Sequence, residues 1–199
     1  MKPNAREKLL EAALGLIREK GYSATSVEDL CARAGVTKGA FFHHFRSKDA
    51  LAVAAADHWS EKTSALFAGA DYHRPADPLD RILAYLDFRK ALVRGAIPEF
   101  TCLVGTMVQE SYGSSDAIRD ACCRSIEGHA QTLEADFAEA LRTYDVGGVT
   151  ARSLALHTQA VIQGAFILAK AANDPARAID SIEHLKRYVE LLFGRKADQ

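Results

Sequence analysis

The residues with the clearest chemical potential lie between Thr37 and Lys48, where small, basic and aromatic side chains are interleaved. Thr37 and Lys38 can bind phosphate oxygens, and the small residues Gly39 and Ala40 follow them directly. Threonine, lysine and helix N-termini are common ligands of DNA phosphates. A helix with small residues near its start can approach the base edges in the major groove closely. The pattern therefore indicates binding to a DNA duplex.

The aromatic residues of this stretch divide between two faces. Phe41 and Phe45 are four residues apart, so they share one face of a helix and can pack against Leu30 of the preceding segment. The two small residues and His43 fall on the opposite face, with Phe42 beside them. A plain helical hairpin with a solvated basic face is the alternative, but it does not explain small residues placed beside cations.

A helix-turn-helix must position these side chains. Apolar residues recur at helical spacing in residues 4–21, 25–35, 37–45 and 47–70, and Gly35 lies between the second and third of these helices. Two short helices joined by a short turn with glycine are typical of the helix-turn-helix.

The rest of the chain also has helical periodicity. The loop 71–78 carries two prolines and marks a domain boundary. The five helices expected after it are Leu79–Arg94, Cys102–Glu110, Ser115–Tyr144, Thr150–Ala172 and Pro175–Phe193. The sequence thus predicts an all-α fold of about nine helices. We expect a helix-turn-helix domain at 1–50, a connecting helix at 47–70, and a ligand-binding and dimerisation domain at 79–199.

Charge is distributed unevenly along the chain. The first 50 residues contain nine Lys/Arg and six Asp/Glu, whereas the remainder contains 16 basic and 20 acidic residues. This asymmetry favours a polyanion-binding N-terminal part on a near-neutral body. The N-terminus is charged, and the longest uncharged stretch, residues 153–169, is too short and polar to span a bilayer. We therefore expect a cytoplasmic protein without a membrane partner.

Catalytic, metal and cofactor sites are not predicted. The four cysteines have neither disulfide-framework nor zinc spacing, so reduced thiols are expected. No glycine-rich phosphate loop, nucleophile elbow or His/carboxylate metal motif is present in the sequence. An enzyme is accordingly only a remote alternative.

Residues 6–55 resemble the TetR/AcrR family of transcriptional regulators. The resemblance is carried by "KGYSATSVEDLCARAGVTKGAFFHHFRSKDAL", which spans three helices in register. It implies a DNA-binding repressor. One departure is Phe42, where the family usually has tyrosine, so a hydroxyl that could contact phosphate is missing. The residues that match DNA-facing positions are Thr25, Ser26, Thr37, Lys38, Gly39, Ala40, Phe42, His43, His44 and Lys48.

The resemblance implies that the remainder senses a ligand and forms a homodimer, and "CLVGTMVQE" (102–110) resembles a C-terminal subtype of such regulators. A pocket for a small, mostly apolar effector needs apolar walls and a few polar anchors. Its candidates, each of which can equally be a core residue, are Phe88, Leu92, Phe100, Cys102, Leu103, Met107, His129, Phe137, Leu141, Gln159, Gln163 and Phe166.

The last two helices are strongly apolar, which favours an interface with a second copy, although both can also be simple core helices. The residues expected at this interface are Leu154, Val161, Leu168, Ile182, Leu185, Val189, Leu192 and Phe193. Two copies would then read a palindromic operator.

Cys102 carries an alternative to reversible effector binding. It stands at the expected start of a helix, where a thiol can become reactive. The alternative function is a thiol-based electrophile or redox sensor, and the simpler interpretation of Cys102 is a small buried hydrophobe.

Overall fold

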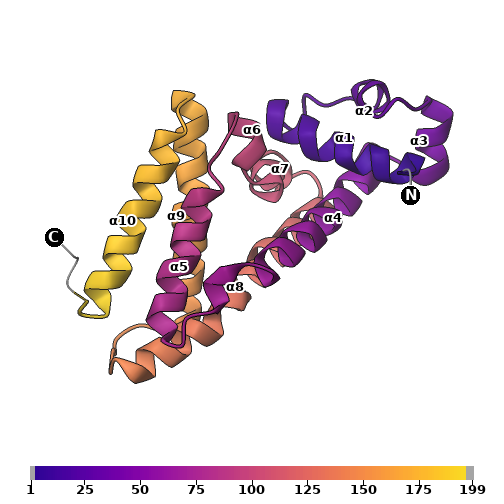
Figure 1. Ribbon diagram of the computed structural model, residues 1–199. Helices are drawn as coiled ribbons and strands as arrows, with labels where there is room; N and C mark the ends of the chain where they lie inside the picture. Colours follow the sequence, from indigo (N-terminus) through magenta and orange to yellow (C-terminus); the bar gives the residue numbers. More distant parts are fainter. Residues whose placement is uncertain (1–2, 196–199) are drawn as a thin grey trace. The chain divides into compact units, whose positions relative to one another are not determined.

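The computed structural model of the protein describes residues 3–195, and these residues contain helices but no β-strand (Figure 1). The α-helices in chain order are α1 (Ala5–Lys20), α2 (Val27–Ala34), α3 (Lys38–His44), α4 (Lys48–Ala68), α5 (Pro78–Ala91), α6 (Ile97–Phe100), α7 (Leu103–Ser111), α8 (Asp116–Thr143), α9 (Ala151–Ala172) and α10 (Ala176–Leu192). A 3₁₀ turn, η1 (Asp71–His73), precedes α5. The predicted all-α class is confirmed, and α6 is an additional short helix that the periodicity did not indicate.

Side-chain caps define where the first three helices begin. Asn4 forms a capping box with Glu7 at α1, and Ser26 forms one with Asp29 at α2. The Thr37 hydroxyl accepts the Ala40 N–H at the start of α3 (3.1 Å). Such caps satisfy backbone N–H groups that have no partner within the helix. The helix-turn-helix is therefore encoded by residues within a few positions of each helix end.

The described residues form two compact units. The head unit consists of residues 3–67 and 101–126, and the second unit consists of residues 68–100 and 127–195. The division expected from the sequence placed everything after residue 79 in one domain. Contacts instead group α7 and the start of α8 with the helix-turn-helix.

The head unit has one continuous hydrophobic core. Phe41 and Phe45, which are 0% and 5% exposed, pack with Leu30 as the four-residue spacing predicted. Leu103 and Met107 of α7 belong to the same core and are both fully buried. The sequence analysis assigned these two residues of α7 to an effector pocket. The structure instead places both side chains in the core of the head unit, apart from the polar anchors His129 and Gln159, which belong to the second unit.

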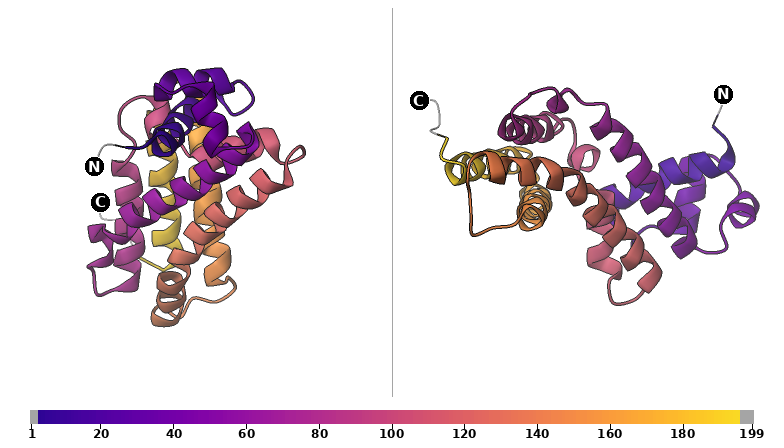
Figure 2. Two further views of the ribbon diagram at one scale, coloured as in Figure 1. Left: turned by 90° about the vertical axis from the view of Figure 1, so that its right-hand side faces the viewer. Right: turned by 90° about the horizontal axis from the view of Figure 1, so that it is seen from below.

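The second unit is built on α5, α9 and α10. Helices α9 and α10 lie side by side in Figures 1 and 2 and form the most extensive helix pair of this unit. The apolar stripe of this pair faces inward: Leu154, Ile182, Leu185, Val189 and Phe193 are at most 5% exposed. These five residues were expected at the interface between two copies. That assignment is corrected, because the chain's own core already covers them.

Large apolar side chains remain exposed on the other faces of the same two helices. Leu168, which the sequence analysis did place at the interface, is 56% exposed, and Val161 and Leu192 are half-buried. Ile167, Tyr188 and Leu191 are exposed as well and were not predicted. Within residues 3–195, no helix is both long and apolar enough to cross a membrane.

Candidate nucleic-acid interface

The outer face of helix α3 carries small and polar residues and one aromatic ring. Gly39, Phe42, His43 and His44 are exposed, and Ala40 is half-buried. Among residues 3–195, and apart from the adjacent residues and the backbone of α3 itself, a Cβ built on Gly39 meets only the Thr37 hydroxyl oxygen within 4 Å, at 3.7 Å, an ordinary contact distance. The folded chain therefore has room for alanine at position 39, and alanine would stabilise the helix by about 1 kcal/mol. Packing within the protein therefore does not require glycine at this position.

The aromatic residues of α3 divide as the spacing predicted. Phe41 is enclosed in the core, whereas Phe42 is 57% exposed. The edge of one ring meets the face of the other, with centroids 5.1 Å apart. The buried ring thus supports the exposed one, which lies beside the small residues of the outer face. An apolar ring there can contact a thymine methyl group or a sugar, but it cannot donate to phosphate.

Lys38 at the start of α3 forms an ion pair with Glu28 of α2. The hydrogen bond from Lys38 lowers the pKa of Glu28, so this carboxylate is charged at neutral pH. Both side chains are more than half exposed. The cation expected to bind phosphate is therefore held by a carboxylate that a phosphate would have to replace.

Glu28→Gln should consequently tighten DNA binding. The substitution releases Lys38 and removes one negative charge from the candidate DNA-binding surface, and we expect a gain of about two- to fivefold at low salt. Fluorescence anisotropy across a salt series measures it. The gain should shrink in a Lys38→Ala background, and an equal gain with and without Lys38 would refute the explanation through this pair.

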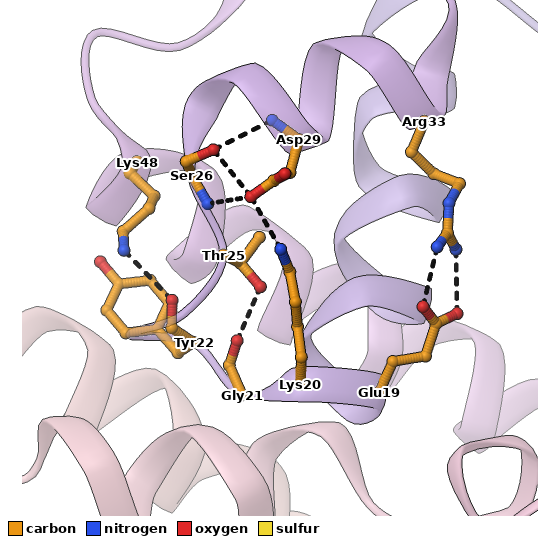
Figure 3. A network of polar contacts seen from close by, with 9 residues as sticks. All are labelled: Glu19, Lys20, Gly21, Tyr22, Thr25, Ser26, Asp29, Arg33 and Lys48. Atoms are coloured by element: carbon orange, nitrogen blue, oxygen red, sulfur yellow. Dashed lines mark hydrogen bonds and ion pairs between the residues drawn. The ribbon is translucent and has the colours of Figure 1, made fainter.

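A network of polar side chains surrounds the start of α2 (Figure 3). Ser26 is exposed, and it both donates to and accepts from Asp29. Lys20 also donates to Asp29 (2.8 Å), and this bond and those from Ser26 hold the pKa of Asp29 well below its usual range. Thr25, in contrast, is 1% exposed and donates its hydroxyl to the Gly21 carbonyl (2.6 Å). Thr25 was matched to a DNA-facing position, and in the structure its side chain is buried and bonded within the turn.

Lys48 lies against the same turn. Its ammonium group donates to the Tyr22 carbonyl (3.1 Å) and lies 4.2 Å from the centroid of the Tyr22 ring (Figure 3). The Tyr22 hydroxyl donates to Asp49 (2.5 Å), and burial, followed by this bond, raises the pKa of Tyr22. Lys48 keeps further N–H donors for a phosphate. Sequence reasoning missed Tyr22, although its place in "KGYSAT" just before the α2 cap was a usable signal.

The second unit contains a polar cluster among aromatic residues. The Tyr85 hydroxyl lies 2.9 Å from Nε2 of His129, and the Gln159 amide donates to the same hydroxyl (3.3 Å). Two of the predicted polar anchors thus meet on Tyr85, which sequence reasoning missed. Burial, followed by the charge of Arg89, lowers the pKa of His129 to about 3. His129 is therefore neutral at neutral pH and can accept one hydrogen bond and donate another.

The other pocket residues predicted in the second unit either make ring contacts or lie in or near the core. Phe100 meets Phe166 at a centroid distance of 5.9 Å, and the Arg89 guanidinium lies 5.7 Å from the Phe166 ring. Phe88 contacts Tyr72 at 5.8 Å. The remaining candidates are Phe137, which is buried, and the half-buried Leu92, Leu141 and Gln163.

Cys102 is the N-cap of α7. Its half-buried Sγ atom accepts the Gly105 N–H at 3.4 Å, and its side chain packs against the head core. Cys102 thus has a capping role, and the alternative of an electrophile or redox sensor stays a prediction. Cys31, Cys122 and Cys123 are also free thiols. Among the described residues, no three His, Cys, Asp or Glu side chains gather as a metal site.

Two family models match the chain. The model described as "Bacterial regulatory proteins, tetR family" matches residues 9–55, and "Transcriptional regulator LmrA/YxaF-like, C-terminal domain" matches residues 78–182. The HTH-type transcriptional regulator LmrA of Bacillus subtilis is 26% identical over 179 residues, which cover 86% of this chain and 89% of LmrA.

Other relatives match more locally. The HTH-type transcriptional repressor Rv3405c of Mycobacterium tuberculosis is 39% identical over 85 residues, which are 41% of this chain and 44% of that protein. The chain spans less than half the length of several of the curated relatives that it matches. The crystal structure of the regulatory protein TetR from Rhodobacter sphaeroides superimposes with a TM-score of 0.81 at 25% identity, covering 92% of this chain and 98% of that one.

Proposed function

Because the chain belongs to the TetR family of bacterial transcriptional regulators, we propose that it is a homodimeric repressor that a small, mostly apolar molecule releases from a palindromic operator. As a member of this family it is a DNA-binding transcriptional regulator and not an enzyme. In this proposal it acts in the cytoplasm. Residues 1–50 with the connecting helix bind the operator, and residues 79–199 bind the effector and the second copy.

The observation that carries the proposed DNA contact is the outer face of α3. Gly39 is a glycine that the chain's own packing does not require, and the half-buried Ala40 follows it. Three exposed groups at the starts of α2 and α3 suit phosphate oxygens, namely Ser26, Thr37 and Lys38. Small residues read base edges in the major groove in this proposal, and the flanking polar groups hold the helix on the backbone.

The proposed dimer uses the outer faces of α9 and α10. Four large apolar side chains are exposed there, namely Ile167, Leu168, Tyr188 and Leu191, with Leu191 at 76%. A second copy that covers these residues would bury apolar surface, which stabilises association. The proposed interface thus lies on the two helices that the sequence indicated, but it is formed mostly by different residues.

The proposed effector site lies among the aromatic residues of the second unit. Support comes from the cluster of Tyr85, His129 and Gln159, which supplies neutral hydrogen-bonding groups beside apolar rings. Small-molecule sites are mostly apolar with a few placed polar groups. This chemistry suits an uncharged or weakly polar aromatic compound.

The test is selection of bound DNA from a random pool by the full-length protein. We expect an imperfect palindrome whose half-sites lie one helical turn, or a multiple of it, apart, and a dimer by light scattering at micromolar concentration. A panel of small aromatic compounds is then added to the complex, and release of DNA by one of them supports the effector proposal. Recovery of a site without dyad symmetry, or of a monomer, would reject the dimeric repressor.

A further inference from the structure

The turn between α1 and α2 determines where α2 begins. The Gly21 N–H donates to Ile17 at the end of α1, and the Thr25 N–H donates to the Tyr22 carbonyl (3.1 Å). Gly21 has a φ of +91°, a conformation that side chains other than glycine rarely adopt. The turn leads directly into the Ser26 cap. Its conformation therefore sets the position of the first phosphate-binding group of α2.

A carboxylate from a distant part of the chain holds this turn. Glu110 of α7 accepts the Tyr22 N–H at 3.1 Å and the Ser23 N–H at 2.7 Å, 88 and 87 residues away along the chain. A Cβ added to Gly21 would lie 2.5 Å from the same carboxylate. Glycine at position 21 thus permits both the backbone conformation and the close approach of Glu110. Hydrogen bonds from backbone amides to a carboxylate are stronger than neutral ones.

Helix α7 is firmly attached to the head. Leu103 and Met107 are fully buried in the head core, which they share with residues of α1. Glu110 lies one helical turn beyond Met107 and is itself exposed. It closes the "CLVGTMVQE" segment, whose last residue had no assigned role. The apolar residues thus anchor α7, and its acidic end reaches the turn.

We propose that Glu110 is a positioning residue for DNA binding, which fixes the α1–α2 turn so that Ser26 and the start of α2 are presented in register with α3. This inference rests on the proposed DNA contact through α2 and α3. Lys48 also holds this turn. It donates a hydrogen bond to the Tyr22 carbonyl, whereas Glu110 accepts one from the Tyr22 N–H. Because Glu110 is solvated, it contributes little to global stability, and its main effect is on the geometry of the turn.

The positioning role of Glu110 predicts that its substitution weakens operator binding, whereas loss of a negative charge alone would strengthen it. Removal of a negative charge from a DNA-binding unit ordinarily strengthens binding, because repulsion of phosphates decreases. Glu110→Gln removes that charge but also removes one acceptor oxygen, and an amide group then faces an N–H donor. We therefore expect the operator Kd to rise about fivefold or more, within the range of typical coupling between sites.

The experiment uses full-length protein and the operator recovered by selection. The matched control is Glu61→Gln, which removes the same charge from an exposed position of α4 in the same unit. The control should bind as tightly as wild type or more tightly. In the free proteins, amide exchange at Tyr22 and Ser23 measured by NMR should accelerate in Glu110→Gln only. The melting temperatures of all three should agree within a few degrees.

The outcomes separate this inference from the proposed function. If wild type selects no DNA, the proposed function fails, whereas accelerated exchange at the two amides still supports the role of Glu110 in the turn. If wild type binds its operator and Glu110→Gln binds equally well, the positioning role is rejected. A loss of affinity explained entirely by a larger unfolded fraction at the assay temperature rejects it as well.

Discussion

Ala40→Leu should lower affinity for the selected operator by about 10- to 100-fold, the range expected when one side chain contact with a base edge is lost. Ala40 lies on the outer face of α3, and its amide is held by the Thr37 cap. Leucine places three more carbon atoms where, in the proposed complex, the protein surface approaches the bases. Both residues favour helices, so the fold of the head should persist. Anisotropy with the wild-type operator measures the loss, and repeated selection shows whether the preferred bases change.

The control for bulk alone is Ala65→Leu, on an exposed position of α4. It should leave DNA binding unchanged. A companion variant, Gly39→Ala, should raise helix stability by up to about 1 kcal/mol while it weakens operator binding. A gain in helix stability together with a loss of operator affinity is expected only if Gly39 is needed for contact with a partner and not for packing within the protein. If Ala40→Leu kept the wild-type affinity and base preference, the assignment of this face to DNA would be untenable.

Acidification should destabilise the wild-type protein through His129. Burial and Arg89 lower its pKa in the folded protein to about 3, whereas the ordinary value is 6.5. Between these values the unfolded chain binds a proton that the folded chain does not, so protonation favours unfolding. The unfolding free energy is therefore unaffected by His129 above about pH 6.5, and below that pH it decreases by about 1.4 kcal/mol per pH unit.

His129→Gln isolates this effect, because glutamine is polar but does not titrate. From pH 6.5 to about pH 4.5, wild type should lose about 2–3 kcal/mol more unfolding free energy than the variant. Urea denaturation followed by circular dichroism provides the comparison. His184→Gln, at an exposed position of α10, should retain the wild-type pH dependence. Parallel pH profiles for wild type and His129→Gln would show that His129 is not held neutral by its surroundings.

The helix-turn-helix could be predicted from the sequence because its determinants are local. The Ser26 and Thr37 caps act within three residues of their own positions, and Gly35 ends α2 in a left-handed conformation with φ of +63°. The four-residue spacing of Phe41 and Phe45 sets which side of α3 is buried, and it leaves the small residues outside. Helical periodicity likewise predicted the long helices that follow, to within a few residues at each end.

The partners of each apolar stripe could not be predicted in this way. Periodicity shows that one side of a helix must be covered, but it does not distinguish the chain's own core from a ligand or a second copy. For this reason Met107 was assigned to a pocket and Leu185 to a dimer interface, whereas both are buried in the core. The exposed Leu191, on the other side of α10, lies outside the regular stripe and carries no periodic signal of its own.

The long-range polar contacts were decided by the tertiary structure as well. Glu110 meets the amides of Tyr22 and Ser23 only because α7 is anchored in the head core beside α1. His129 meets Gln159 only through Tyr85, a residue from a third helix. The sequence by itself therefore determined the surface that we propose to approach DNA, since neighbouring residues build it. Only the packing of distant helices decided which residues hold that surface in place, because such contacts depend on how apolar faces pair in three dimensions.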